Sequence, residues 1–319
     1  MTGRDLQPQT TTLNVSHVTV YRYARPVELG AHRMMMRPRD GHDQRLIASQ
    51  LAIEPRPKRL RWLYDAFDNC VAMASFSGST TELRVENRFT VERSEDDSPG
   101  GEIDPAAQTY PFSYAPEELP DIARSIERLY NDPSGELDRW AHQFVVAGGT
   151  IPTSRMLMTM TYAIRESFIY ERREESGVQS PRRTLDRRRG SCRDFAVLMM
   201  EAARALGIGA RFVSGYVYVP RDEQGEDVRV GGGATHAWCQ VYLPGAGWVE
   251  FDPTNGLIGG RDLIRVAVAR DPGQAAPLTG TYLGSLEDEL GMEVTVEVTQ
   301  QKSRDAVLRE ETPQLARGI

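Results

Sequence analysis

A cysteine at the start of an amphipathic segment is the feature that most constrains this chain. Cys192 follows a glycine and a serine and precedes residues 195–206, in which apolar side chains recur at helical spacing. Gly207 then supplies the stop that is typical of a helix C-terminus. A thiol in the first turn of a helix lies near unpaired backbone N–H groups and the positive end of the helix dipole, and Arg189 and Arg193 add positive charge beside it. These surroundings favour the thiolate, so the pattern predicts a nucleophilic cysteine; the alternative is a cysteine that is only packed.

The composition excludes several classes of protein. The chain has 319 residues, of which 40% are hydrophobic and 26% are charged, which is typical of a soluble globular protein of roughly two domains. A net charge of −7 argues against a nucleic-acid partner. The polar N-terminus lacks an apolar signal core, no apolar run is long enough to span a membrane, and three cysteines cannot form a complete disulfide set. We therefore expect a cytoplasmic protein with reduced thiols and no membrane association.

The chain changes its hydrophobic period near residue 100. Residues 11–92 alternate apolar and polar side chains in several short segments, which predicts a small β-sandwich or barrel. A charged, glycine-containing connection follows at 94–101, and beyond it the period becomes helical. The expected fold class is α+β. The expected parts are an N-terminal β domain over 1–110, a helical region over 111–152, a catalytic core of helices and antiparallel sheet over 153–290, and a partly disordered tail over 291–319.

Two strands near residue 245 are predicted to bring a histidine beside an aspartate. Residues 235–242 and 248–254 are patterned as strands, and residues 243–247 form the connection between them. A connection of this length pairs Tyr242 with Trp248, so His236 and Asp252 lie on one face as diagonal neighbours within side-chain reach. A connection shorter by one residue would put them on opposite faces.

Cysteine, imidazole and carboxylate together provide nucleophilic catalysis. Imidazole has a suitable pKa to activate a thiol, and a carboxylate on its second nitrogen fixes the tautomer and stabilises the cation. We therefore assign Cys192 as nucleophile, His236 as base and Asp252 as its orienting acid. The backbone N–H of Cys192 is a candidate oxyanion donor, with Tyr170 as a candidate for the second. Tyr170 and Trp238 are also candidates for lining an acyl-side pocket, with core packing as the alternative for both.

Other polar segments have simpler interpretations. Asp194 is either a residue that supports the site from behind or a first-turn carboxylate favoured by the helix dipole. Seven arginines lie between 172 and 189; we favour a solvated loop over a positive field that attracts acidic substrates. The acidic and glycine-rich segment 222–233 lacks calcium-loop spacing and is expected to border the site as a mobile loop. No metal-site or cofactor motif is present in the sequence, so we expect neither.

Four motifs in fixed order resemble the bacterial transglutaminase-like family. They are Gly190-Ser-Cys-Arg-Asp-Phe-Ala, Ala210-Arg-Phe-Val-Ser-Gly-Tyr, Thr235-His-Ala-Trp and Gly247-Trp-Val-Glu-Phe-Asp-Pro-Thr-Asn. The segments around Tyr21, His32 and Arg37 are similar to the β domain that precedes the core in one bacterial branch. The resemblance implies a papain-like core, a triad of Cys192, His236 and Asp252, and acyl transfer through a thioester. It also implies that peptide-ligase-type proteins are possible partners.

Two functions from different classes remain open. The first is a thiol enzyme that attacks an amide bond of a peptide or protein substrate through an acyl-enzyme on Cys192, ending in hydrolysis or transfer to a small amine. The second is a non-catalytic interaction module that keeps the fold and binds a partner through its β domain. The presence of all three triad residues favours the enzyme.

Overall fold

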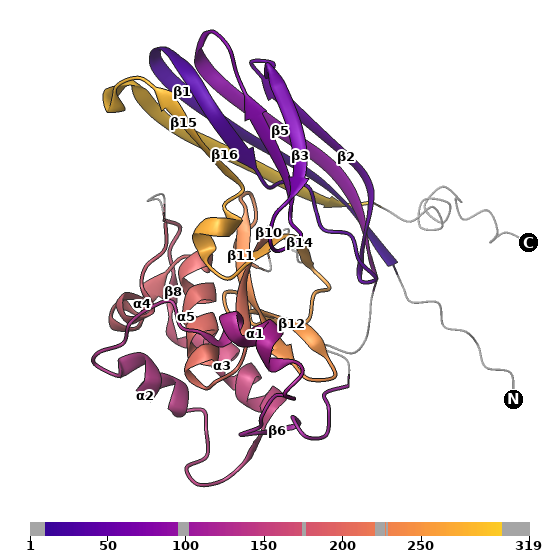
Figure 1. The fold of residues 1–319 in the computed structure, drawn as a ribbon, viewed down its shortest axis with the longest axis vertical. Helices are drawn as coiled ribbons and strands as arrows, with labels where there is room; N and C mark the ends of the chain where they lie inside the picture. Colours follow the sequence, from indigo (N-terminus) through magenta and orange to yellow (C-terminus); the bar gives the residue numbers. More distant parts are fainter. Residues whose placement is uncertain (1–9, 95–101, 174–176, 221–226, 228, 302–319) are drawn as a thin grey trace, which may run out of the picture.

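The structure of the protein is a computed structural model, which describes residues 10–94, 102–173, 177–220, 227 and 229–301. A large antiparallel sheet at the N-terminal end lies against a core of helices and a second antiparallel sheet (Figure 1). The expected α+β class is therefore confirmed. The predicted connection at 95–101 and the tail beyond residue 301 lie outside the described residues.

The N-terminal part is one strongly curved sheet. Its strands occur in the order β2-β5-β1-β4-β3, and two further strands, β15 and β16, pair with β1. The bounds are β1 (Thr10–Met34), β2 (Gln44–Glu54), β3 (Arg59–Tyr64), β4 (Cys70–Ser75), β5 (Ser79–Ser94), β15 (Leu278–Leu283) and β16 (Glu289–Gln300).

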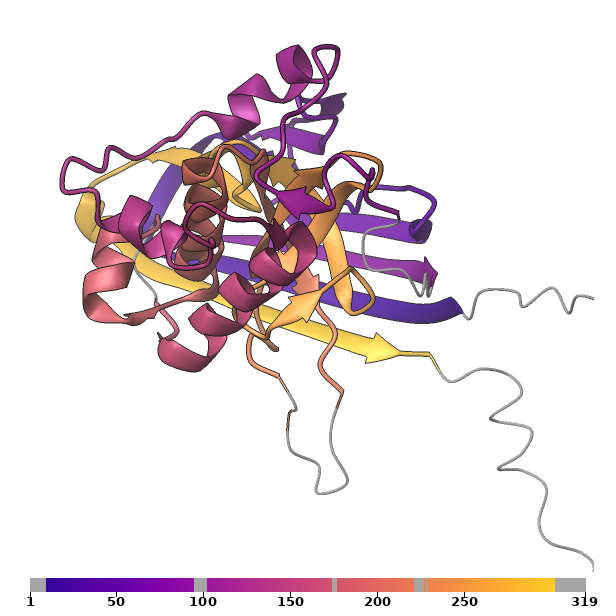
Figure 2. The same ribbon diagram turned by 90° about the horizontal axis from the view of Figure 1, so that it is seen from below.

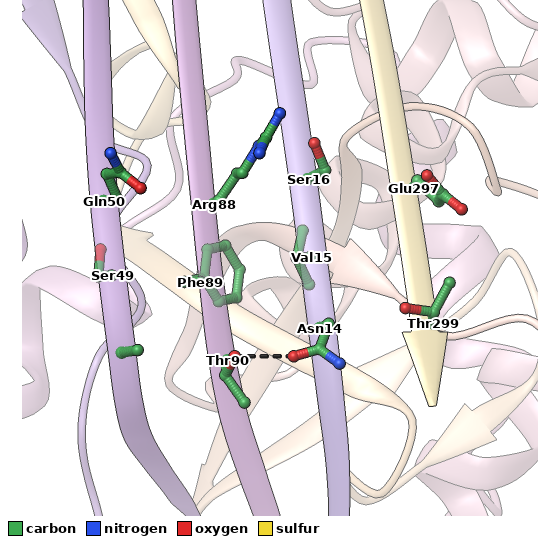
Figure 3. A pocket seen from close by; sticks show the side chains of 11 residues that line it. Asn14, Val15, Ser16, Ser49, Gln50, Arg88, Phe89, Thr90, Glu297 and Thr299 are labelled. Atoms are coloured by element: carbon green, nitrogen blue, oxygen red, sulfur yellow. Dashed lines mark hydrogen bonds between the residues drawn. The ribbon is translucent and has the colours of Figure 1, made fainter. Parts of the chain in front are cut away.

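Alternation of side chains gives this sheet two different faces. Leu83, Val85, Phe89 and Val91 of β5 are buried, as the sequence pattern predicts, while the residues between them are polar. On the opposite face, polar side chains of β1, β2, β5 and β16 line a shallow hollow of about 400 Å³ (Figure 3). Thr90 donates a hydrogen bond to Asn14 Oδ1 there at 2.7 Å. One face of the sheet is thus available to pack on the core.

The C-terminal part of the chain corrects the expected domain limits. Residues 291–300 are not a disordered tail but part of β16, which runs beside β1 from Leu13 opposite Gln300 to Tyr23 opposite Glu289 (Figures 1 and 2). Val294, Val296 and Val298 alternate with polar residues and pack against the core, so the period-2 pattern was present in the sequence. The N-terminal sheet therefore contains strands from both ends of the chain, and the core is inserted between them.

The core places one buried helix, α5, against a five-stranded antiparallel sheet. The sheet order is β13-β12-β11-β10-β14. Its bounds are β10 (Ala210–Val217), β11 (His236–Leu243), β12 (Gly247–Asp252), β13 (Leu257–Ile258) and β14 (Leu263–Ala269). The helices are α1 (Leu119–Ile126), α2 (Glu136–His142), α3 (Thr153–Ser167), α4 (Pro181–Arg187) and α5 (Cys192–Ala205). Short pieces complete the core: β6 (Thr109–Tyr110), β7 (Ile151–Pro152), β8 (Ile169–Tyr170), β9 (Arg189–Gly190) and the 3-10 turn η1 (Pro272–Ala275). A second 3-10 turn, η2 (Leu286–Asp288), connects β15 to β16 in the N-terminal sheet.

The helix α4 lies in the arginine-rich segment that we expected to be a loop. Ser180 precedes it, and its hydroxyl accepts a hydrogen bond from the Arg183 N–H at 3.3 Å, while Pro181 occupies the first turn. A serine followed by a proline is a legible start signal for a helix. The sequence did not show a helical period here because this short helix buries few residues, Pro181 and Thr184, within a run of charged side chains.

Polar and apolar contacts hold the two parts of the molecule together. Tyr216 of β10 contacts Val15 and Phe89 within one buried cluster and forms a 2.7 Å hydrogen bond with His17 of β1. The Asn69 side chain donates to the Val268 carbonyl at 2.7 Å and accepts from the Val268 N–H at 2.9 Å. The N-terminal sheet is therefore an integral wall of the core. Among the described residues, no helix is long and apolar enough to cross a membrane.

Candidate active site

Cys192 is the first residue of α5, as the sequence predicts. Its side chain lies in the main buried cluster with 8% of its surface exposed. Ser191 caps the helix in an extended conformation, and the Ser191 and Asp194 side chains form a capping box. The helix therefore begins at a fixed position, and its free backbone N–H groups lie beside the thiol.

Asp194 fixes the segment that carries the cysteine. It is wholly buried and accepts hydrogen bonds from the backbone N–H groups of Gln179 (2.7 Å) and Ser191 (2.8 Å). The guanidinium of Arg173 pairs with it at 2.9 Å. Burial alone would raise the pKa of this carboxyl, but the donors, with the Gln179 N–H foremost, lower it. Asp194 is therefore compatible with both sequence-based interpretations. It is a carboxylate in the first turn of α5, and its hydrogen bonds also link neighbouring loops to this helix.

The hairpin of β11 and β12 has the register that the site requires. Tyr242 lies opposite Trp248, and the pairing continues to Cys239 opposite Phe251. The predicted register is therefore confirmed, and it places His236 and Asp252 on one face. The His236 Nε2 lies 2.8 Å from Asp252 Oδ2, and both side chains have no exposed surface.

The contact with Asp252 fixes which nitrogen of His236 carries the proton. A carboxylate can only accept, so Nε2 carries the proton that points to Asp252 and leaves Nδ1 as the basic atom. Among the described residues Nδ1 has no hydrogen-bond partner. Burial would lower the pKa of His236, but the charge and hydrogen bond of Asp252, with an added contribution from the Cys192 thiol, raise it. The Cys192 thiol therefore favours the charged ring together with Asp252.

Asn255 holds the carboxylate and the neighbouring loop together. Its side-chain amide donates to Asp252 Oδ2 at 2.9 Å, and its Oδ1 accepts from the Val230 N–H at 3.0 Å. The Thr254 N–H donates to the other oxygen of Asp252 at 2.9 Å. Burial raises the pKa of Asp252, whereas the His236 charge and these donors lower it. The carboxylate is thus kept ionised and fixed in orientation.

A glycine covers the basic nitrogen of His236. Gly231 has φ of +98°, and a side chain at this position would place its Cβ 2.7 Å from His236 Nδ1. The part of the predicted glycine-rich loop that the structure describes, 229–233, therefore does border the site, while residues 222–226 and 228 lie outside the described residues. The sequence pattern indicated a loop, but it did not reveal that Gly231 is required for space as well as for its backbone conformation.

Tyr170, the candidate for the second oxyanion donor, lies on a strand next to the segment that precedes Cys192. It belongs to β8, which pairs in parallel with β9 so that Tyr170 lies opposite Gly190. Burial and the Cys192 sulfur raise the pKa of Tyr170 to about 12, while Arg172 and Arg193 oppose the shift. The phenol therefore remains protonated at neutral pH and is able to donate a hydrogen bond near the thiol.

Trp238 does not line a pocket. Its ring is fully buried, stacks on His236 at a centroid distance of 5.9 Å, and donates its N–H to Glu250. A buried ring offers no surface to a substrate, so the expected pocket role is wrong and the packing alternative holds. Glu250 was not identified from the sequence, although it accepts from Gln240 at 2.8 Å and from Arg265 at 2.7 Å.

Among the residues that the structure describes, no group of three His, Cys, Asp or Glu side chains is arranged to hold a metal ion. A direct contact joins the imidazole of His236 to the carboxylate of Asp252, and the Cys192 thiol helps to raise the pKa of that imidazole.

Comparison with known proteins identifies the family. Residues 13–92 match the bacterial transglutaminase-like N-terminal region, and residues 138–253 match the transglutaminase-like superfamily. The chain is a bacterial transglutaminase-like protein. The family resemblance carried by the sequence motifs is thereby confirmed.

Relatives of this transglutaminase-like protein cover almost its whole length. An uncharacterized protein of Mycobacterium tuberculosis is 27% identical over 292 residues, which is 89% of this chain and 91% of that protein. A protein-glutamine gamma-glutamyltransferase of Pseudomonas aeruginosa is 38% identical over 70 residues, 22% of this chain but 10% of that protein. The crystal structure of a candidate cysteine protease from Cytophaga hutchinsonii has a TM-score of 0.66 with 18% identity and covers 92% of both chains. That structural likeness extends the shared fold across both parts of the chain.

Proposed function

We propose that this transglutaminase-like protein is a cysteine-dependent enzyme that acts on an amide bond of a peptide or protein. The observation that carries the proposal is the buried 2.8 Å contact of His236 with Asp252, which leaves the opposite ring nitrogen without a described partner in a ring whose pKa the Cys192 thiol also raises. A carboxylate that orients an imidazole beside a thiol is the arrangement of nucleophilic acyl transfer.

The reaction begins with a thiolate–imidazolium pair. The Cys192 thiolate attacks the amide carbonyl, and its negative charge moves to the carbonyl oxygen. The His236 imidazolium then donates its Nδ1 proton to the leaving nitrogen, so the C–N bond breaks and an amine departs from a thioester. Water or a second amine gives its proton to His236 and attacks the thioester carbonyl, the C–S bond breaks, the acid or amide product leaves, and the Cys192 thiolate and His236 imidazolium are restored. Asp252 stabilises the imidazolium in both steps.

Two donors are proposed for the oxyanion. The backbone N–H of Cys192 is one of the free groups at the start of α5, where the helix dipole favours negative charge. The phenol of Tyr170 is the second, since it lies opposite Gly190 and remains protonated. Tyr170→Phe is expected to lower kcat by about 100-fold, the usual effect of removing one such donor, and to leave KM within a few-fold.

Alkylation by iodoacetamide tests the nucleophile. At pH 7, Cys192 is expected to react at least tenfold faster than a free thiol compound, while the fully buried Cys239 stays unmodified. Site-resolved mass spectrometry separates the cysteines. If Cys192 reacts no faster than the free thiol and Cys192→Ala leaves every amide-cleaving activity unchanged, the protein is a non-catalytic interaction module.

The acceptor is proposed to be water or a small amine. The glycine-rich segment beside His236 carries little side-chain bulk to exclude water, whereas a cross-linking enzyme must exclude it. Acyl-enzyme formed from a peptide amide should give carboxylic acid in buffer and a mixture of acid and amide when methylamine is added. Formation of amide product alone would contradict this assignment.

A further inference from the structure

A second cavity lies at the far end of the sheet face that carries His236. Its volume is about 750 Å³, and it is bounded by α1, by the turn between β3 and β4, and by β10, β11 and β12. Tyr242, which lines it, is six residues beyond His236 on β11, which corresponds to about 20 Å along a strand. The cavity is therefore separate from the catalytic centre.

One wall of this cavity carries an arginine without an acidic partner. The Arg211 Nε donates to Gln240 Oε1 at 2.7 Å, and its guanidinium lies 4.0 Å from the centre of the Trp248 ring. Its terminal nitrogens donate to none of the described residues, and they are not among the buried atoms that lack partners, so they open into the cavity. Burial, with the nearby charges of Arg39 and Arg265, lowers the pKa of Arg211 to about 9, although the charge of Glu250 opposes the shift. A positive charge in this setting is stabilised by an anion.

The opposite wall carries negative charge. Glu117, Glu118 and Asp121 project from α1 and the residues before it. Glu118 accepts a hydrogen bond from Tyr242 at 2.6 Å, whereas Glu117 and Asp121 have no partner among the described residues and are exposed. The other two arginines of the cavity, Arg124 and Arg270, are both paired with Glu127. The charges left available are thus positive at Arg211 and negative at α1.

We propose that this cavity binds a small zwitterion, with a carboxylate against Arg211 and an ammonium group against the acids of α1. This is the chemistry of a free amino acid or a short peptide with free ends. A guanidinium recognises a carboxylate through two parallel N–H donors, and the Trp248 ring fixes the plane of that guanidinium. The volume is sufficient for a molecule of this size, since ligand pockets of about 300–1,000 Å³ are typical.

Calorimetric titration of the full chain with L-alanine, L-alanyl-L-alanine, acetate and methylammonium tests the site. One of the two zwitterions is expected to bind saturably and at least tenfold more tightly than acetate or methylammonium. The tighter of the two identifies whether a single amino acid or a dipeptide fits the cavity. Equal affinity for acetate and the zwitterions, or no saturable binding by either zwitterion, would overturn the proposal.

Variants on both walls make the assignment independent of folding defects. Arg211→Met is expected to weaken binding at least tenfold, with Arg61→Met on the exposed strand β3 as its control. Because Arg211 is largely buried, the double variant Glu117→Gln/Asp121→Asn provides a test on exposed residues, and Glu166→Gln on α3 is its control. Loss of binding in both wall variants and not in the controls supports the site. Unchanged binding in the double variant contradicts the ammonium contact.

Discussion

Replacement of Asp252 by asparagine provides the sharpest test of the catalytic arrangement. The carboxylate lies 2.8 Å from His236 Nε2, and both groups are without exposed surface. Asparagine keeps the shape and the acceptor for the Thr254 N–H but removes the charge. Breaking a buried ion pair by removing one partner typically costs about 3–5 kcal/mol. At the lower value, the thiolate–imidazolium pair becomes about 100-fold less populated, since each 1.4 kcal/mol is a factor of ten.

The sign of the pH effect follows from the influences on His236. Burial lowers the pKa of the ring, and Asp252 with a smaller contribution from Cys192 raises it, so loss of the carboxylate removes the larger of the raising contributions and lowers that pKa. In the native protein the imidazolium persists through neutral pH and its stabilisation is lost only as the pH rises through the raised pKa. In Asp252→Asn it is lost at a lower pH, below neutrality.

The assay is the rate of Cys192 alkylation by iodoacetamide between pH 5 and 9. The variant should react about 100-fold more slowly at pH 7, and its rate should rise with pH as that of a free thiol does. Asp43→Asn is a matched control, because it removes a partly buried carboxylate that pairs with Arg265 at 3.0 Å, away from the thiol. Alkylation of Asp252→Asn at the native rate and with the native pH profile would refute the proposed role of the carboxylate.

Three further predictions concern other parts of the structure. Gly231→Ala should lower kcat/KM at least tenfold because its Cβ would lie 2.7 Å from His236 Nδ1. Gly233 also has a positive φ, but no atom lies within 4 Å of the position that a Cβ would take there, so Gly233→Ala should retain activity. Equal losses of kcat/KM in the two variants would mean that backbone strain alone, and not contact with His236, lowers the activity. Glu201→Ala should lower the free energy of unfolding in urea by about 3–5 kcal/mol, because it leaves Arg204 buried without its partner at 2.7 Å; a change below 1 kcal/mol would contradict this. Burial lowers the pKa of His17 to about 4, so protonation of this group should lower the free energy of unfolding by about 3 kcal/mol as the pH falls from 6.5 to 4. His17→Asn should make the free energy of unfolding less dependent on pH over this range. An unchanged pH dependence in the variant would contradict the assignment to His17.

The local features of the candidate site could be predicted from the sequence. The pattern was sufficient to place Cys192 at the start of a helix and to pair His236 with Asp252 across a hairpin of fixed parity. These features are local: helix spacing, a glycine stop and strand alternation act within about 20 residues. Local patterns are legible without an alignment because each residue is judged only against its neighbours along the chain.

How the parts close around that site depends on contacts between segments far apart in the chain. The strand β16 was readable as a strand, but its place beside β1 depends on contacts across some 280 residues, such as His17 with Val296. The burial of Trp238 in one cluster with Val213 and Val268, and the hydrogen bond from the Val230 N–H to Asn255, likewise join segments that are separate in the sequence. A period of two predicts which side of a strand is apolar, but it does not specify which other element covers that side. Many apolar faces of similar size could cover it, and the choice between them is made only when the whole core packs.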